Sequence, residues 1–326
     1  MTTLEATGYI VVGTDGSKRA RGAIDWAAEV AQGRGLPLLI VQTVSEFPIP
    51  SRTGVYSAMI HGGLPEEILD STKRSLAREA RRVRKDRPGL TVDETVIEGR
   101  ASYVLARASK TAELVVVGAR GVGVPLKVRA LGGTSDAVAT HAHGPVAIIP
   151  DEGDPTPDGP VLVGVDDSEE SRAAIRLAVS AARRRGVPLI ALHAWTTPWL
   201  DGEAATTFKP DDLERSFEGL VERLVRPYVD RAPGLDLEIR VVNQRPASAL
   251  VEASTGCSLV LVGSRGRDGF AGLLLGSTSR GLLRDAHCPV IVMRRGAQLA
   301  DDISDPTGPD ADATPDADAT PGDPPR

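Results

Sequence analysis

The sequence predicts an α/β protein that contains two tandem copies of one domain. The segment IVVGTDGS at residues 10–17 recurs as VLVGVDDS at 161–168, and ELVVVGARG at 113–121 recurs as SLVLVGSRG at 258–266. In each copy short apolar runs alternate with helical stretches, which is the pattern of a parallel sheet with helices on both faces. The repeat therefore predicts two domains of the same fold.

The other strands of each copy follow from the same repeat. Second strands are expected at 36–44 (LPLLIVQTV) and 187–195 (VPLIALHAW). Last strands are expected within AHGPVAIIP at 142–150 and AHCPVIVMR at 286–294. Because edge strands tend to pair, we expect these two last strands to pair within one chain.

The first helix of each copy is marked by its pattern and its ends. Small and apolar residues recur at spacings of four, three and four over Ala20–Ala31, which predicts one buried stripe. Ser168 is the expected N-cap of the second copy, with acidic residues in the first turn. Gly35 and Gly186, each two residues before a proline, are expected to end these helices.

The second helix of each copy is expected at Glu66–Arg84 and at Asp211–Asp230. Each follows a long loop, at 46–63 or 196–210, of the kind that acts as a lid or mobile segment. Pro227 is expected to kink or shorten the later helix. The residues expected to be buried at helical spacing are Ile68, Thr72, Leu76, Ala80, Leu213, Phe217, Leu220 and Leu224.

Composition divides the chain further. We expect domains at 1–150 and 160–296, a polar linker at 151–159 and a disordered acidic tail at 297–326. The tail holds eight Asp and one Arg, a net charge of −7, which leaves +1 for the rest of a chain whose net charge is −6. This near-neutral balance gives no electrostatic reason to expect nucleic acid binding.

Several classes of protein are not expected. The residues before Tyr9 lack the pattern of a signal peptide, and no apolar run approaches the roughly 20 residues that span a bilayer, so we expect no membrane contact. Cys257 and Cys288 are too few for a disulfide framework or a zinc site, which favours buried thiols in a cytoplasmic setting. His141 and His143 are interpreted as helix-end residues rather than metal ligands, and His193 as a core histidine.

The stretch LVLVGSRGRDGFAGLLLGSTS at 259–279 has the pattern of a buried strand, a glycine loop and a helix start. Glycines let backbone N–H groups approach an anion, and a helix N-terminus adds partial positive charge, so the stretch predicts phosphate binding. The loop lacks the Gly-Lys-Ser/Thr of a P-loop and the tight G-x-G of a dinucleotide site. Such a loop can also serve only to reverse the chain, and on the loop alone both interpretations stay open.

The glycine spacing is more specific. Gly263, two residues, Gly266, nine residues and then Gly276-Ser277 resemble the ATP-binding signature of the universal stress proteins. The resemblance covers about residues 8–295. It implies tandem Rossmann-like domains of the adenine nucleotide alpha hydrolase type, each with a five-stranded mostly parallel sheet. It also implies dimerisation partly through the last strands and a role in stress or dormancy responses.

The resemblance assigns roles to residues of the second copy. Adenine would lie near Asp166 and Ala194, with Gly164 lining the same pocket, although an aspartate here could merely start the next helix. Ser277 is the expected side-chain contact to a phosphate, and Arg265 would add charge unless it is only solvated. The phosphate contacts are expected from Gly263, Ser264, Arg265, Gly266, Gly276, Ser277 and Thr278.

The first copy departs from the signature. Its corresponding residues are Gly13, Asp15, Gly118, Gly121, Gly132, Gly133 and Thr134. Ten residues rather than nine separate Gly121 from Gly132, Gly133 stands at the serine position, and Pro125 restricts the loop. Either Thr134 replaces the missing hydroxyl and binding is retained in altered form, or the site has become a structural copy.

The expected function is therefore that of an ATP-binding regulator, with Mg²⁺ accompanying the nucleotide and an unknown protein partner. The alternative is a stress-response scaffold whose glycine loops are structural. We find no Ser-His-Asp arrangement and no residue placed as a general base, so at most slow ATP hydrolysis or autophosphorylation is expected. A homodimer or pairing of the two domains within one chain is expected.

Overall fold

The computed structural model describes residues 4–44, 66–121, 131–151, 156–196, 210–266 and 274–297. Domain 1 contains β1 (Ile10–Thr14), α1 (Ala20–Arg34), β2 (Leu38–Val44), α3 (Glu66–Asp86), β3 (Val92–Glu98), α4 (Ala101–Ala108), β4 (Leu114–Gly118), α5 (Gly133–His141) and β5 (Val146–Ile149). Domain 2 contains β6 (Val161–Gly164), α6 (Glu169–Arg185), β7 (Leu189–Trp195), α7 (Pro210–Val229), β8 (Leu237–Asn243), α8 (Pro246–Ala253), β9 (Leu259–Gly263), α9 (Ser277–Asp285) and β10 (Val290–Met293). The loops predicted at 46–63 and, apart from its two end residues, 196–210 lie outside the described residues, as does the tail beyond Ala297.

The strands form one ten-stranded sheet in the order β3-β2-β1-β4-β5-β10-β9-β6-β7-β8. Within each domain every described strand pair is parallel. The two domains meet where β5 and β10 run antiparallel, with Ala147 opposite Ile291. The predicted pairing of the two last strands within one chain is therefore confirmed.

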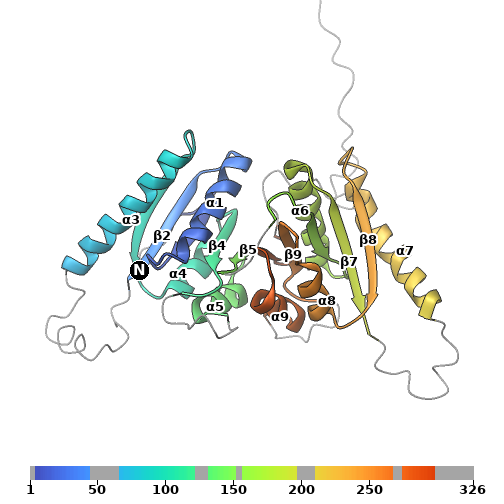
Figure 1. Ribbon diagram of the computed structural model, residues 1–326. Helices are drawn as coiled ribbons and strands as arrows, with labels where there is room; N and C mark the ends of the chain where they lie inside the picture. The colour runs from blue at the N-terminus through green and yellow to red at the C-terminus, as the bar shows by residue number, and fades with distance from the viewer. Residues whose placement is uncertain are drawn as a thin grey trace, which may run out of the picture.

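Helices cover both faces of the sheet, as predicted (Figure 1). One apolar cluster joins the sheet to α1, α3, α6 and α7, and the other joins it to α4, α5, α8 and α9. Successive strand residues alternate between the clusters, since Val12 belongs to the first and Val11 to the second. The inner strands, such as β1 and β4, are buried on both faces, which explains their apolar sequences, whereas the edge strands β3 and β8 carry exposed charged residues.

The predicted ends of the first helices are confirmed. Gly35 and Gly186 adopt φ values of 64° and 66°, the left-handed conformation in which glycine avoids a Cβ penalty. Ser168 caps α6, because its Oγ accepts a hydrogen bond from the Ser171 backbone N–H at 3.1 Å.

The prediction that Ile68 is buried is wrong, since the residue is 46% exposed. The 21 residues of α3 span about 31 Å, whereas the seven of β3 span about 23 Å, so the first turns of α3 extend beyond the strand. Thr72, Leu213, Phe217 and Leu220 are only half-buried, whereas Leu76, Ala80 and Leu224 are buried as predicted. Helix α7 continues through Pro227 and ends two residues later.

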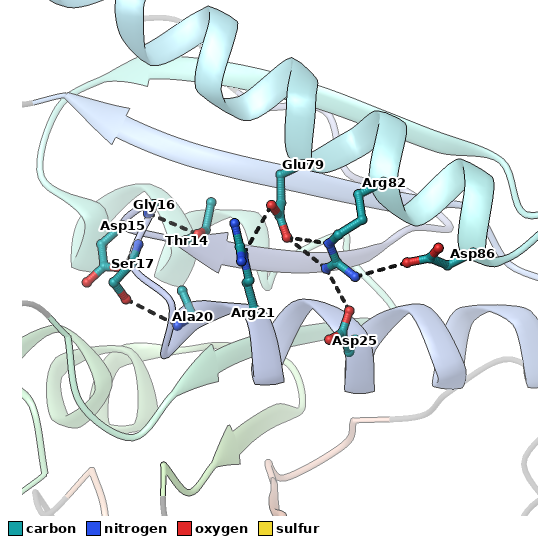
Figure 2. Close-up of polar contacts among 10 residues, drawn as sticks. All are labelled: Thr14, Asp15, Gly16, Ser17, Ala20, Arg21, Asp25, Glu79, Arg82 and Asp86. Carbon is teal, nitrogen blue, oxygen red and sulfur yellow. Dashed lines mark hydrogen bonds and ion pairs between the residues drawn. The ribbon is translucent and has the colours of Figure 1, made fainter.

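Charged side chains hold α3 against α1 (Figure 2). The Nη2 of Arg82 lies 2.7 Å from Oδ1 of Asp25 and 2.7 Å from Oε1 of Glu79. Its Nη1 lies 3.3 Å from Oδ2 of Asp86, and Arg21 reaches Glu79 at 3.4 Å.

The basic runs at 81–87 and 183–185 also contribute contacts between elements. Arg84 pairs with Glu94 of β3 at 2.5 Å, and Arg87 donates to Gln32 of α1 at 2.9 Å. In the second run, Arg185 lies 3.6 Å from Glu29 of domain 1.

Candidate functional site

The candidate sites lie where the order of strands reverses. In each domain the chain builds the first three strands outward and then returns to place the fourth beside the first. Open α/β sheets bind ligands beyond the carboxyl ends of the two strands at this reversal. These strands are β1 and β4 in domain 1, and β6 and β9 in domain 2. The aspartate and the glycine loop of each copy follow these strands.

In domain 2 the Asp166 carboxylate lies against the glycine loop. Its Oδ1 accepts hydrogen bonds from the hydroxyl and, at 3.0 Å, the backbone N–H of Ser168. Its other oxygen, Oδ2, would lie 2.7 Å from a Cβ atom placed on Gly266. One oxygen therefore starts helix α6, and the other faces the loop.

Domain 1 repeats this arrangement. Oδ1 of Asp15 accepts from the Ser17 backbone N–H at 2.9 Å, and Oδ2 would lie 3.0 Å from a Cβ atom on Gly121. Both interpretations of these aspartates, as helix starter and as a group facing a ligand loop, thus have a geometric counterpart in the same side chain.

The end of each glycine loop is closed by equivalent hydrogen bonds. The Gly276 N–H donates to the Ser264 carbonyl at 2.8 Å, and the Gly132 N–H donates to the Ala119 carbonyl at 2.8 Å. Gly276 and Gly132 precede α9 and α5 in extended conformations, and among the described residues no side chain caps either helix. The N-termini of α9 and α5 therefore adjoin the residues that follow β9 and β4.

A buried serine that sequence reasoning missed ties each helix to its strand. Ser279 Oγ donates to the Gly263 carbonyl at 2.7 Å, and Ser135 Oγ donates to the Gly118 carbonyl at 2.6 Å. These hydroxyls satisfy the carbonyls where the strands end, and so fix the helix start relative to the loop. The shared Thr-Ser pair at 134–135 and 278–279 was the available signal.

The exposed hydroxyls differ between the domains. Ser277 is exposed at the start of α9, and its counterpart in domain 1 is Gly133, which is also exposed. Thr134 stands in register with Thr278 one residue later. The extra residue of the domain 1 loop lies between Gly121 and Gly132. Most of that loop, 122–130 with Pro125, lies outside the described residues.

Ion pairs flank both loops. Arg265 Nη2 lies 3.1 Å from Oε1 of Glu170, whose side chain is only 9% exposed, so Arg265 is not simply solvated. In domain 1 the corresponding Arg120 pairs instead with Asp151 at 2.8 Å. Burial, aided by the charge of Arg265, lowers the pKa of the neighbouring Arg294 to about 10, so its guanidinium stays charged at neutral pH.

The remaining predicted residues have packing roles. A Cβ atom on Gly13 would lie 2.5 Å from Cδ1 of Leu105 on α4, and one on Gly164 would lie 3.2 Å from Cδ1 of Leu250 on α8. A Cβ atom on Gly263 would lie 2.9 Å from Cβ of Glu170. Ala194 is half-buried on β7 and packs against the same cluster as α8. The structure thus gives these glycines a steric reason besides any ligand.

A cavity of about 500 Å³ lies elsewhere in domain 1. It is lined by the turn after β3 and by α4 and α5, including Arg100, Tyr103 and His141, and none of the predicted site residues lines it. Tyr103 is 47% exposed, so the cavity opens to solvent. The glycine loops, which lie at the strand reversal, are therefore not part of it.

The other candidates are structural. His193 is half-buried with Nδ1 2.7 Å from the Val165 carbonyl oxygen, as expected of a core histidine. Cys257 and Cys288 are free and buried, as expected, and burial raises the pKa of both thiols, that of Cys257 to about 11. The described part of the chain contains no group of three or more His, Cys, Asp or Glu side chains that could hold a metal ion.

Sequence comparisons identify the family. The model of the universal stress protein family matches residues 8–150 and 159–294. Universal stress protein Rv1996 of Mycobacterium tuberculosis is 35% identical over 300 residues, which cover 87% of this chain and 94% of that protein. Universal stress protein Rv2623 of the same organism is 36% identical over 301 residues, covering 87% and 96%. The chain therefore belongs to the universal stress protein family.

A solved structure shows the same fold. The crystal structure of a universal stress protein from Archaeoglobus fulgidus DSM 4304 matches with a TM-score of 0.63 at 19% identity, covering 89% of this chain and 99% of that chain. A universal stress protein solved in complex with cAMP matches 42% of this chain and 98% of its own, with a TM-score of 0.32 at 25% identity. Among the described helices, none is both long and apolar enough to cross a membrane.

Proposed function

We propose that the chain is an ATP-binding universal stress protein, in which nucleotide occupancy regulates a stress or dormancy response. The observation that carries this proposal is the cradle in domain 2. There a carboxylate oxygen of Asp166 faces Gly266. Helix α9 follows Gly276, which has no side chain with which to cap the helix.

The groups of the cradle suit the two ends of a nucleotide. The outer oxygen of Asp166 can accept a hydrogen bond from an exocyclic amine or a ribose hydroxyl. At the other end, the backbone N–H groups of α9 and the exposed hydroxyl of Ser277 can donate to phosphate oxygens, and the helix dipole favours the negative charge. We propose ATP as the nucleotide because the glycine spacing resembles the ATP-binding signature of the family.

The cradle supports binding rather than rapid turnover. Glu170, the buried acid nearest the loop, is already paired with Arg265, and the described residues offer no cluster of acids for a metal ion. Mg²⁺ would therefore arrive with the triphosphate, whose charge it neutralises. Domain 1 retains the cradle of Asp15 and Gly121 but lacks the serine, so we propose weaker binding there.

A scaffold function is the second candidate. The close approach of Leu105 to Gly13 and of Glu170 to Gly263 supports a packing role for these two glycines that needs no ligand. In this alternative the loops are structural, and the chain contacts an unknown protein partner without nucleotide. In either case we propose a cytoplasmic setting, in which the two thiols stay reduced.

The test is a count of bound nucleotide. The purified chain is denatured, and the adenine nucleotide released per chain is measured by chromatography and mass spectrometry, before and after incubation with ATP and Mg²⁺. One nucleotide per chain that is lost in Gly266→Val, or two of which one remains in that variant, supports the proposal. No nucleotide under either condition would favour the scaffold.

A further inference from the structure

Arg294 joins the segment before α9 of domain 2 to the last turn of α5 in domain 1. It follows β10, and its side chain is only 9% exposed. Its Nη1 donates to the Leu274 carbonyl at 2.6 Å, and its Nη2 donates to the carbonyl of Ala139 on α5 of domain 1. Leu274 lies two residues before Gly276, the N-cap of α9.

The hydrogen bond to α5 satisfies a backbone carbonyl that has no donor from its own helix. The Ala139 carbonyl lies in the last turn, where the regular partner would be the backbone N–H of His143. That N–H donates instead to Ser109 Oγ at 2.8 Å. Arg294 supplies the missing donor from the other domain, and the position equivalent to it in domain 1 is Pro150, which has no donor.

Of the three guanidinium nitrogens of Arg294, Nη1 and Nη2 make the hydrogen bonds given above. Its Nε is buried and has no hydrogen-bond partner among the described residues. A buried donor without a partner is unfavourable, and the guanidinium is a rigid planar fork. A shift of the Leu274 carbonyl should therefore move the whole group and change its bond to Ala139, rather than being absorbed by a flexible side chain.

The two helices that follow the glycine loops, α5 and α9, are neighbours at the junction. Figure 1 shows α5 and α9 side by side where the domains meet, and Arg280 of α9 lies 3.5 Å from Asp136 of α5. The antiparallel pairing of β5 with β10 fixes the backbone behind them.

We propose that Arg294 transmits nucleotide occupancy of domain 2 to helix α5 of domain 1. The proposal rests on nucleotide binding at the domain 2 loop. Phosphates bound to the first turn of α9 order the segment from Leu274 to Ser277, which sets the position of the guanidinium and tightens the last turn of α5. Because couplings between sites are reciprocal, a ligand at the start of α5 would favour binding in domain 2.

The experiment measures amide hydrogen exchange with and without ATP and Mg²⁺ in the full chain carrying Gly121→Val. This substitution blocks domain 1, so any change in α5 must come from domain 2. We expect slower exchange at the start of α9 and, in the last turn of α5, protection that rises about five-fold or more. Protection of α9 with no change in α5 would overturn the proposal. No change in either helix would instead show that domain 2 binds no nucleotide and would overturn the proposed function as well.

Substitutions at the junction identify the side chain responsible. In the Gly121→Val background, Arg294→Met should keep the α9 response and lose that of α5, whereas Arg295→Met should keep both. Arg295 is the matched control because it is 69% exposed and pairs with Glu169. An α5 response that persists in Arg294→Met would overturn the proposal. If that variant does not fold, Arg294→Lys, which cannot bond both carbonyls with one planar group, decides the same question.

Discussion

The Asp166 carboxylate and the Cα of Gly266 approach so closely that a Cβ atom on the glycine would lie 2.7 Å from Oδ2. The loop after β9 can lie this close to the loop after β6 because Gly266 has no side chain. The same contact recurs between Asp15 and Gly121 in domain 1, at 3.0 Å. This repeated fit makes the glycine position the most direct place to separate ligand binding from folding.

Gly266→Val should abolish nucleotide binding in domain 2 while the chain stays folded. A β-branched side chain would press on the Asp166 carboxylate and occupy the space beside it, and an exposed loop can absorb the strain. Calorimetric titration with ATP and Mg²⁺ measures the loss, and circular dichroism checks the fold. Gly22→Val is the control, because nothing lies within 4 Å of a Cβ atom at Gly22. Undiminished affinity in Gly266→Val would refute the site assignment.

Two serines two residues apart should separate stability from binding. Ser279→Ala removes the donor to the buried Gly263 carbonyl, so we expect a loss of about 1–3 kcal/mol in the free energy of unfolding. Ser277→Ala changes an exposed side chain, so we expect an unfolding free energy within about 0.5 kcal/mol of the original and weaker ATP binding. Urea unfolding and ATP titration of both variants measure these effects. Equal effects of the two substitutions on both properties would contradict this division.

Arg82→Met should weaken the attachment of α3 to α1 (Figure 2). The guanidinium serves three carboxylates, but its side chain is 31% exposed, so we expect a loss of only about 1 kcal/mol in the free energy of unfolding. Urea unfolding at low salt and in 1 M NaCl measures it, and the difference from the original chain should shrink at high salt because exposed charges are screened. Arg81→Met, at the exposed neighbouring position, should have little effect. A difference independent of salt would show that Arg82 acts through packing instead.

The two thiols should be unreactive until the chain unfolds. Burial raises the pKa of Cys257 to about 11 and also raises that of Cys288, so little thiolate forms at pH 8. A colorimetric thiol reagent should titrate almost none in the native chain and two per chain in urea.

The pH dependence of stability follows from the same thiols. Because the folded thiol has the higher pKa, its protonation favours the folded chain. The full contribution requires a pH at which the unfolded thiol is protonated as well. The contribution of Cys257 is therefore complete below about pH 8.5 and is lost as the pH rises toward 11. Cys257→Ala should lose less stability than the original chain over this interval. An identical loss in both chains would show that other groups govern alkaline unfolding.

Local signals in the sequence predicted most of the fold. Gly35 and Gly186 ended their helices, and the repeated strands took the predicted places, because a helix end or a buried strand depends on neighbouring residues. Periodicity indicates which face of a helix is apolar, but not whether the sheet reaches beneath it. This is why the burial of Ile68 was predicted wrongly.

The missed residues of the candidate site depend on distant partners. Ser279 bonds a carbonyl 16 residues earlier, and Arg294 bonds carbonyls 20 and 155 residues away. The Thr-Ser pair shared by the two copies marks Ser279 as a repeated residue, but neither it nor the residues around Arg294 identify the distant carbonyls that accept these bonds. The pairing of Arg265 with Glu170 likewise required the fold that brings two loops together.

The antiparallel junction of β5 and β10 also has an evolutionary consequence. Since both domains belong to one polypeptide, each edge strand meets its partner at a high effective concentration, without a search among separate molecules. Within one chain, each domain is therefore matched with the other domain across this edge. The two halves can therefore differ in sequence, as they do where domain 1 has Gly133 and domain 2 has Ser277.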